Sequence, residues 1–197
     1  MTLTKPRLAI FPVLGVVVLL GLSVGPVRAD FDAGLTAYQK HDYATALKEW
    51  LPAAENGDSH AQHMLGFLYA QGRGVAIDPA QTVIWWTRAA EQGFAPAQYT
   101  LGTLYRRGLG VKRDLEKARV WIGRAADGGY PDAQYAFGVM YVTGEGVKPD
   151  LSTAFMWLSL AADTRGLPPE TFWPDIDKFL TPEQRLEADQ LKKSWNK

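Results

Sequence analysis

The sequence predicts an all-α solenoid of antiparallel helix pairs, closed at its C-terminal end by a capping helix. Three observations predict it: an aspartate and a pair of alanines each recur every 36 residues, and the apolar residues between them have helical spacing. A fixed period of this length is typical of repeat proteins, whose stacked units bury a continuous core. The recurring residues are Asp42, Asp78, Asp114 and Asp150, and the pairs Ala53-Ala54, Ala89-Ala90, Ala125-Ala126 and Ala161-Ala162.

Residues 1–29 are predicted to be a secretory signal peptide. Lys5 and Arg7 precede an apolar run, and small residues surround the predicted cleavage site after Ala29. A retained membrane anchor is the alternative, but the run is short for a span of about 20 apolar residues. The chain has no cysteine, which excludes a lipid-modified cysteine and any disulfide. We therefore expect a periplasmic or secreted protein with no stable membrane anchor after cleavage.

Loss of the signal peptide would leave 18 basic against 21 acidic residues, a balance that argues against a general nucleic-acid binder. What remains is long enough for one domain with a sizeable core. We expect an N-terminal capping helix at 30–41, repeats at 42–77, 78–113 and 114–149, a partial fourth repeat at 150–166, and a C-terminal cap at 167–197.

Each unit is predicted to contain two helices. In the first helix of the second unit, Asp78 is placed to cap the free backbone N–H groups and Pro79 suits the first helical position. The buried face of this helix is predicted to carry Trp86, Ala89 and Ala90.

The second helix of each unit has one apolar stripe, which in the first unit is Ala61, Leu65, Leu68 and Tyr69. A glycine lies inside this helix in all three units, which costs about 0.5–1 kcal/mol relative to alanine. We therefore expect close approach of a neighbouring helix at Gly66, Gly102 and Gly138. A Gly-x-Gly-Val motif ends each unit and supplies residues that can adopt positive φ.

The repeat pattern ends after Arg165-Gly166, where prolines replace the second helix of the fourth unit. Thr181 to Gln184 forms a capping box that opens a last helix. We expect its apolar residues to cover the end of the solenoid: Leu186, Ala188, Leu191 and Trp195.

These motifs resemble the Sel1-like repeat family, relatives of tetratricopeptide repeats, over roughly 120 residues. Gly72-Arg73-Gly74-Val75 and its two copies carry the resemblance, together with the alanine pairs and Ala61-Gln62. It implies a right-handed solenoid whose first helices line a concave groove, with residues 31–40 as a leading capping helix. It also implies an interaction role, because exported members include regulators of membrane sensor kinases and scaffolds of exopolysaccharide secretion.

No catalytic, cofactor or metal constellation is recognised in the sequence, so the prediction is a non-enzymatic protein. Its serines lie outside any Gly-x-Ser-x-Gly elbow, and the repeated Gly-x-Gly follows helices rather than strands. His60 and His63 could share a helix face and bind a metal with Asp58. Because neither histidine recurs in the other units, an exposed, solvated pair is the preferred interpretation.

Tryptophan recurs at 85, 121 and 157, where packing between units is preferred over partner contact because every unit keeps it. Trp173 lies outside the repeat and is the better candidate for an exposed anchor. Arg88 and Arg124 occupy equivalent positions on successive first helices, which the resemblance places on the groove.

A basic run is the strongest difference between units, with seven cations against two acids between residues 106 and 124. An acidic segment or carboxylate of a protein partner could dock there; an ordinary solvated surface is the alternative. The candidate contact residues of the run are Arg106, Arg107, Lys112, Arg113, Lys117, Arg119 and Arg124.

The predicted function is a protein-interaction scaffold or regulator in the bacterial envelope, which binds a partner segment in the solenoid groove. Two alternatives stay open: a hydrolase acting on cell-wall or beta-lactam substrates, and a glycan- or peptidoglycan-binding module that uses exposed tryptophans and tyrosines.

Overall fold

The computed structural model describes residues 31–168, 171–172, 174 and 176–195. The predicted signal peptide and Trp173 lie outside the described residues. The helices are α1 (Phe31–Gln39), α2 (Tyr43–Glu55), α3 (Ser59–Gln71), α4 (Pro79–Glu91), α5 (Ala95–Arg107), α6 (Leu115–Asp127), α7 (Pro131–Thr143), α8 (Leu151–Thr164), α9 (Ile176–Phe179) and α10 (Pro182–Trp195).

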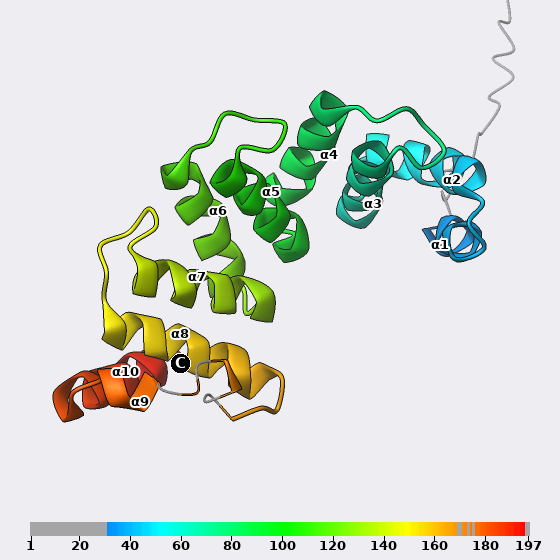
Figure 1. The fold of residues 1–197 in the computed structure, drawn as a ribbon. Helices are drawn as coiled ribbons and strands as arrows, with labels where there is room; N and C mark the ends of the chain where they lie inside the picture. Colours follow the sequence, from blue (N-terminus) through cyan, green and yellow to red (C-terminus); the bar gives the residue numbers. More distant parts are fainter. Residues whose placement is uncertain (1–30, 169–170, 173, 175, 196–197) are drawn as a thin grey trace, which may run out of the picture.

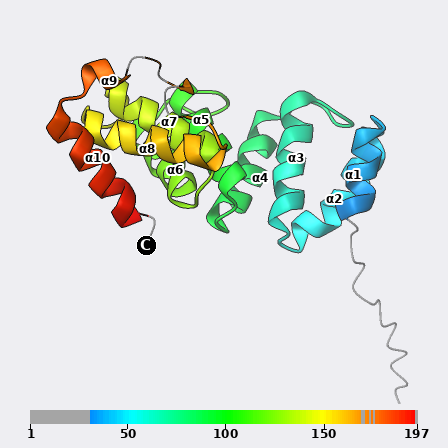
Figure 2. The same cartoon turned by 90° about the horizontal axis from the view of Figure 1, so that it is seen from below.

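The predicted all-α architecture of antiparallel helix pairs is confirmed. From α1 to α8 each helix packs on the next one along the chain, and the stack bends into an arc (Figure 1). The three long connections, at residues 72–78, 108–114 and 144–150, lie along the outer edge of this arc (Figure 1). We call this side the loop edge, and α10 lies across α8 at one end of the stack (Figure 2).

Aspartate caps the first helix of each unit, as the sequence predicts. The carboxylate of Asp78 accepts from the backbone N–H groups of Ala80 at 2.9 Å and Gln81 at 3.0 Å. Equivalent bonds are made by Asp42, Asp114 and Asp150. Each bond satisfies a backbone donor that the helix itself leaves free.

The recurring Ala-Gln pair has a structural role that links the two helices of each unit. The amide of Gln98 donates to the backbone carbonyl of Ala90 at 3.1 Å, and Gln62 does the same to Ala54 at 2.9 Å. The carbonyls at a helix C-terminus have no partner within the helix, so a buried glutamine satisfies one of them.

The helical glycines lie where a neighbouring helix approaches closely, as predicted. A Cβ at Gly66 would lie 2.2 Å from the indole nitrogen of Trp86, and one at Gly138 would lie 2.8 Å from Leu158 Cγ. The same geometry joins α1 to α2, because a Cβ at Gly34 would lie 2.3 Å from the indole nitrogen of Trp50. Helix α1 therefore docks on the stack in the manner of a second helix.

Both glycines of each Gly-x-Gly have positive φ, with values between 65° and 76°. The second glycine also approaches the first helix of its own unit. A Cβ at Gly146 would lie 2.8 Å from the carbonyl oxygen of Leu115, and one at Gly74 would lie 2.7 Å from the backbone of Tyr43. These contacts hold the loop edge against the start of the helices.

Helix α10 closes the stack by packing on α8. The predicted capping box is present: Thr181 N donates to Gln184 Oε1 at 2.9 Å, and Gln184 N donates to Thr181 Oγ1 at 3.3 Å. Ala188 is 1% exposed. The prediction that Leu186 covers the end of the solenoid is wrong: its side chain is 60% exposed, because it is two residues from the buried Ala188 and so points to nearly the opposite side of the helix. Within the described part of the chain, none of the helices has the length and apolar character to cross a membrane.

Candidate functional site

Two depressions occupy equivalent places on the loop edge, one unit apart. The smaller has a volume of about 480 Å³ and is lined by Tyr105, residues 111–114 and Lys117. The larger has a volume of about 760 Å³ and includes the equivalent residues Tyr141 and 147–150. The 36-residue repeat therefore builds the same surface twice, with a tyrosine from the second helix beside the long connection.

Cations dominate the smaller depression. The ammonium of Lys117 lies 5.1 Å from the ring centroid of Tyr105 and 3.8 Å from a carboxylate oxygen of Asp114. Lys112 and Arg113 are exposed on its rim. Asp114 already accepts from the backbone of α6, so its charge is partly used within the fold.

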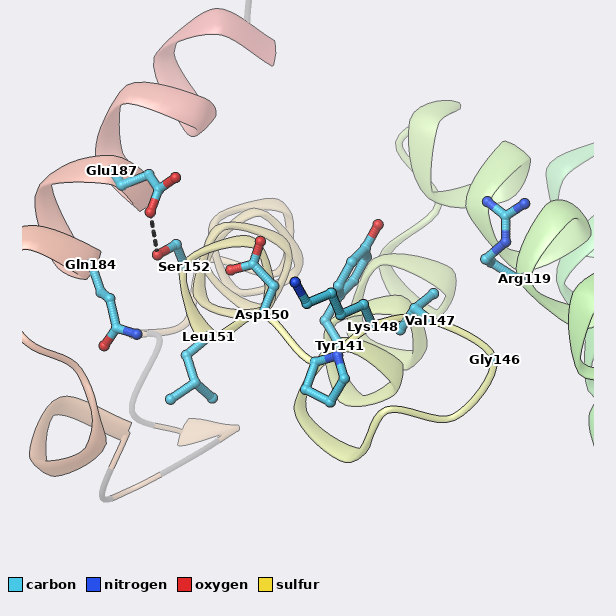
Figure 3. A pocket seen from close by; sticks show the side chains of 11 residues that line it. Arg119, Tyr141, Gly146, Val147, Lys148, Asp150, Leu151, Ser152, Gln184 and Glu187 are labelled. Carbon is cyan, nitrogen blue, oxygen red and sulfur yellow. Dashed lines mark hydrogen bonds between the residues drawn. The ribbon is translucent and has the colours of Figure 1, made fainter.

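The larger depression is built from α6, α7, α8, α10 and the α7–α8 connection (Figure 3). Arg119 comes from α6, Tyr141 from α7, Lys148 from the α7–α8 connection, and Glu187 from α10. The Ser152 hydroxyl donates to a carboxylate oxygen of Glu187 at 2.7 Å, a bond that ties α10 to α8. Arg119 lies at the α6 side of the site and Glu187 at the α10 side, and the Lys148 side chain points toward Asp150 between them (Figure 3).

The surroundings of Tyr141 and Glu116 shift the pKa values of both side chains. Burial raises the pKa of Tyr141, and the nearby Arg119 cation opposes that rise. Arg119 also donates to Glu116, and this hydrogen bond lowers the pKa of the Glu116 carboxyl. Tyr141 is therefore a neutral hydroxyl at physiological pH, available as a hydrogen-bond donor or acceptor.

Part of the basic run is neutralised inside the protein. Glu145 lies 3.1 Å from Arg113 and 3.9 Å from Arg106, so it links two successive connections of the loop edge. Arg107 and Lys112 are exposed and have no carboxylate within 4.0 Å in the described part of the chain. Arg124 is likewise exposed and has no ion pair with a described residue, so these three cations are the unpaired ones of the run.

Arg88 and Arg124 lie away from the loop edge. The Arg88 guanidinium is 4.7 Å from the ring centroid of Trp85, and that of Arg124 is 4.8 Å from Trp121. Arg124 is seven residues beyond Lys117, or about 10 Å along the helix axis. The structure therefore divides the predicted basic residues between the loop edge and the opposite ends of the first helices.

The recurring tryptophans are mainly packing residues. Trp85 and Trp157 are each 5% exposed, and Trp121 is half-buried. Their burial agrees with the interpretation that repetition indicates packing.

The interpretation of His60 and His63 as an exposed pair is wrong for His63. Its side chain is 8% exposed, and its ring lies 4.8 Å from that of Phe67 and 5.3 Å from that of Phe94. Burial, with a smaller contribution from His60, lowers the pKa of His63 to about 4. The ring is shielded from water because Phe67 of α3 and Phe94 of the next unit pack against it.

His60 is exposed, and its Nδ1 lies 4.0 Å from a carboxylate oxygen of Asp58. Across the residues that the structure describes, no three histidine or acidic side chains are grouped as metal ligands would be. The carboxylates of the larger depression serve the fold: Asp150 caps α8, and Glu187 accepts from Ser152.

The sequence interpretation missed the tyrosines and Lys148 as parts of a surface. Tyr105 and Tyr141 recur in register, but their periodicity indicates only a structural role. Lys148 lies outside the basic run, and only folding places it in the same depression as Arg119 of α6 (Figure 3).

A family model and one similar solved structure support the repeat assignment. The family model described as Sel1 repeat matches residues 59–94, 95–130 and 131–163. The crystal structure of a Sel1 repeat protein from Oxalobacter formigenes is similar, with a TM-score of 0.71 and 28% identity over 79% of this chain. A protective antigen present in uropathogenic Escherichia coli strains, which displays an SLR fold, gives a TM-score of 0.49 and 27% identity over 84% of this chain. The chain spans 63% and 44% of those two chains, and no curated protein matches it.

Proposed function

Because the chain belongs to the Sel1 repeat family, we propose that it is an envelope scaffold whose loop edge binds an acidic segment of a partner protein. Sel1 repeat proteins typically serve protein–protein interaction and are usually non-catalytic, although some carry enzymatic activity; no enzyme family matches this chain. One observation carries the finer proposal: two equivalent depressions lie side by side along the chain, and cations line both.

The chemistry of the smaller depression favours a carboxylate-bearing ligand. Lys112, which lines it, is an exposed cation without an internal partner among the described residues, whereas the acids nearby are used in caps and ion pairs. A partner's aspartate or glutamate would gain charge-assisted hydrogen bonds there without displacing a bond of the fold. The position of Lys148 and Arg119 one unit further extends the cationic surface for a longer segment.

A peptide-binding measurement tests this proposal. The probe is a short fluorescein-labelled peptide rich in aspartate and glutamate, and binding is followed by fluorescence anisotropy. We expect the double variant Lys112→Glu/Lys117→Glu to weaken binding by about tenfold or more, because two attractive charges become repulsive. Raising the salt concentration should weaken binding of the natural chain for the same reason.

Matched variants locate the surface. Lys40→Glu/Lys48→Glu makes the same charge change at two exposed positions, after α1 and on α2, and should leave the affinity close to that of the natural chain. The predicted groove contacts are tested by Arg88→Glu/Arg124→Glu. If that variant abolishes binding while the loop-edge variant does not, the binding surface lies at the other end of the first helices and the loop-edge proposal is wrong.

We also propose that the chain is exported, with residues 1–29 removed as a signal peptide. The support is the order of a basic start, an apolar run and small residues before Asp30. Intact-mass analysis of the protein recovered from the periplasm or medium of its host should give a chain that begins at Asp30. Recovery of the full-length chain in the membrane fraction would instead support a retained anchor.

A further inference from the structure

A third depression on the loop edge differs in character from the two charged ones. It has a volume of about 250 Å³ and lies between the α3–α4 and α5–α6 connections. Ile77 and Leu109 form its rim and are 66% and 51% exposed, while Trp86 and Leu104 contribute to its lining. Large aliphatic side chains that are this exposed on both sides of one hollow are the usual mark of a contact surface.

The hollow offers almost no polar chemistry. The two lining side chains that could donate a hydrogen bond already do so elsewhere. The Thr82 hydroxyl donates to the carbonyl of Asp78 at 2.9 Å, and the Trp86 indole donates to the carbonyl of His63 at 3.0 Å. A polar ligand group would lose its hydrogen bonds to water in the hollow and gain none from the protein. The hollow therefore favours an apolar side chain.

The apolar hollow and the smaller cationic depression are lined by successive residues of the same elements. Leu109 and Gly110 line the hollow, and residues 111–113 of the same connection line the cationic depression. On α5, Leu104 faces the hollow and the next residue, Tyr105, faces the cations. A single extended segment can therefore place an apolar side chain in one and an acidic side chain in the other.

From this neighbouring placement we infer that the hollow between Ile77 and Leu109 is a specificity pocket that takes one leucine-like side chain of the acidic partner segment. This inference rests on the proposed function, because it places the same segment on the same edge. Charge complementarity next to the hollow identifies the occupant: the neighbouring surface selects carboxylates, and the hollow selects an aliphatic anchor beside them.

Paired peptides test the pocket on the full chain. One labelled peptide carries several acidic residues and a single leucine, a second has serine in its place, and a further pair puts the leucine on the other side of the acids. We expect one leucine peptide to bind about tenfold or more tightly than its serine partner, because the hollow removes the apolar leucine side chain from water. The double variant Ile77→Ser/Leu109→Ser should remove this advantage.

Ile84→Ser is the matched control, because Ile84 is 42% exposed on α4 and does not line the hollow. It should keep the preference for leucine. Thermal unfolding followed by circular dichroism checks that Ile77→Ser/Leu109→Ser and Ile84→Ser stay folded. We expect both to do so, because the replaced side chains are exposed.

The outcomes separate this inference from the proposed function. If leucine and serine peptides bind equally while Lys112→Glu/Lys117→Glu weakens both, the pocket is refuted and the acidic-segment proposal stands. A preference for leucine that survives in Ile77→Ser/Leu109→Ser also refutes the pocket. If no acidic peptide binds at all, both proposals are wrong.

Discussion

At the scale of single residues, the helical glycines are the positions where the fold is least tolerant of a larger side chain. Replacement of Gly66 by alanine would put a Cβ 2.2 Å from the Trp86 indole nitrogen, so the helices must move apart. We expect Gly66→Ala to lower the free energy of unfolding by about 1–3 kcal/mol, despite the better helix propensity of alanine.

Urea unfolding followed by circular dichroism measures this change. Gly128→Ala is the control, because a Cβ there has no heavy atom nearer than 3.4 Å and the backbone φ is −73°. Equal stability of the two variants would show that α3 and α4 do not approach as closely as described.

His63 gives a second residue-scale prediction. In the native protein its pKa is lowered to about 4, whereas in the unfolded chain it is about 6.5. Between these values the unfolded state binds a proton that the native state does not, so stability falls as the pH decreases from about 6.5 to about 4. Above pH 6.5 both states are neutral and the effect is absent.

We expect His63→Tyr to reduce this loss of stability by up to about 3 kcal/mol, at about 1.4 kcal/mol per pKa unit. Tyrosine is chosen because Tyr99 and Tyr135 occupy the equivalent positions of the next two units. Free energies of unfolding measured across this pH range give the comparison, with His60→Ser as the exposed control. Parallel pH profiles for the natural chain and His63→Tyr would contradict the burial of His63.

At the scale of helices, the C-terminal cap is the contact that can be tested independently of the repeats. Ala188 is 1% exposed against α8, so Ala188→Glu puts a charge into that contact. We expect faster amide hydrogen exchange in α10 and α8 and unchanged exchange in α2 to α5, because each unit of a solenoid contacts only its neighbours.

Leu186→Glu makes a similar change on the same helix at a position that is 60% exposed, and it should leave exchange unchanged. Loss of protection along the whole stack in Ala188→Glu would mean that the solenoid unfolds as one unit.

Much of the element scale could be predicted from the sequence, because the repeat fixes local requirements. Asp78 had to cap a helix, and Gly66 had to allow close approach, since these residue types serve few other purposes at such positions. The periodicity of Leu186 did not reveal which side of α10 would be covered. That depends on how α10 packs across α8, which no repeat unit encodes.

The candidate site was harder to predict, because side chains from different units meet only after folding. Arg119 of α6 and Lys148 of the α7–α8 connection face one depression, while Arg124, only five residues after Arg119, contacts Trp121 instead. Along the sequence, all cations of the basic run form one group, although folding separates them. The burial of His63 was missed for the same reason, since Phe94 reaches it from the next unit.

At the scale of the whole molecule, the loop edge combines three neighbouring hollows: one apolar, one cationic, and one with cations and carboxylates. The family assignment accounts for the stack of helices, and these hollows distinguish the surface of this chain. An acidic segment that runs along the edge would meet them in that order.

Zero-length crosslinking between lysines and carboxylates in the native host, followed by mass spectrometry, tests the central claim most directly. We predict that Lys112, Lys117 or Lys148 links to aspartate or glutamate residues of one dominant protein, and that Lys112→Glu/Lys117→Glu removes that protein from the crosslinked material. Crosslinks to the same protein that are unchanged in this variant, or that come instead from Lys48 and Lys193, would contradict a loop-edge scaffold.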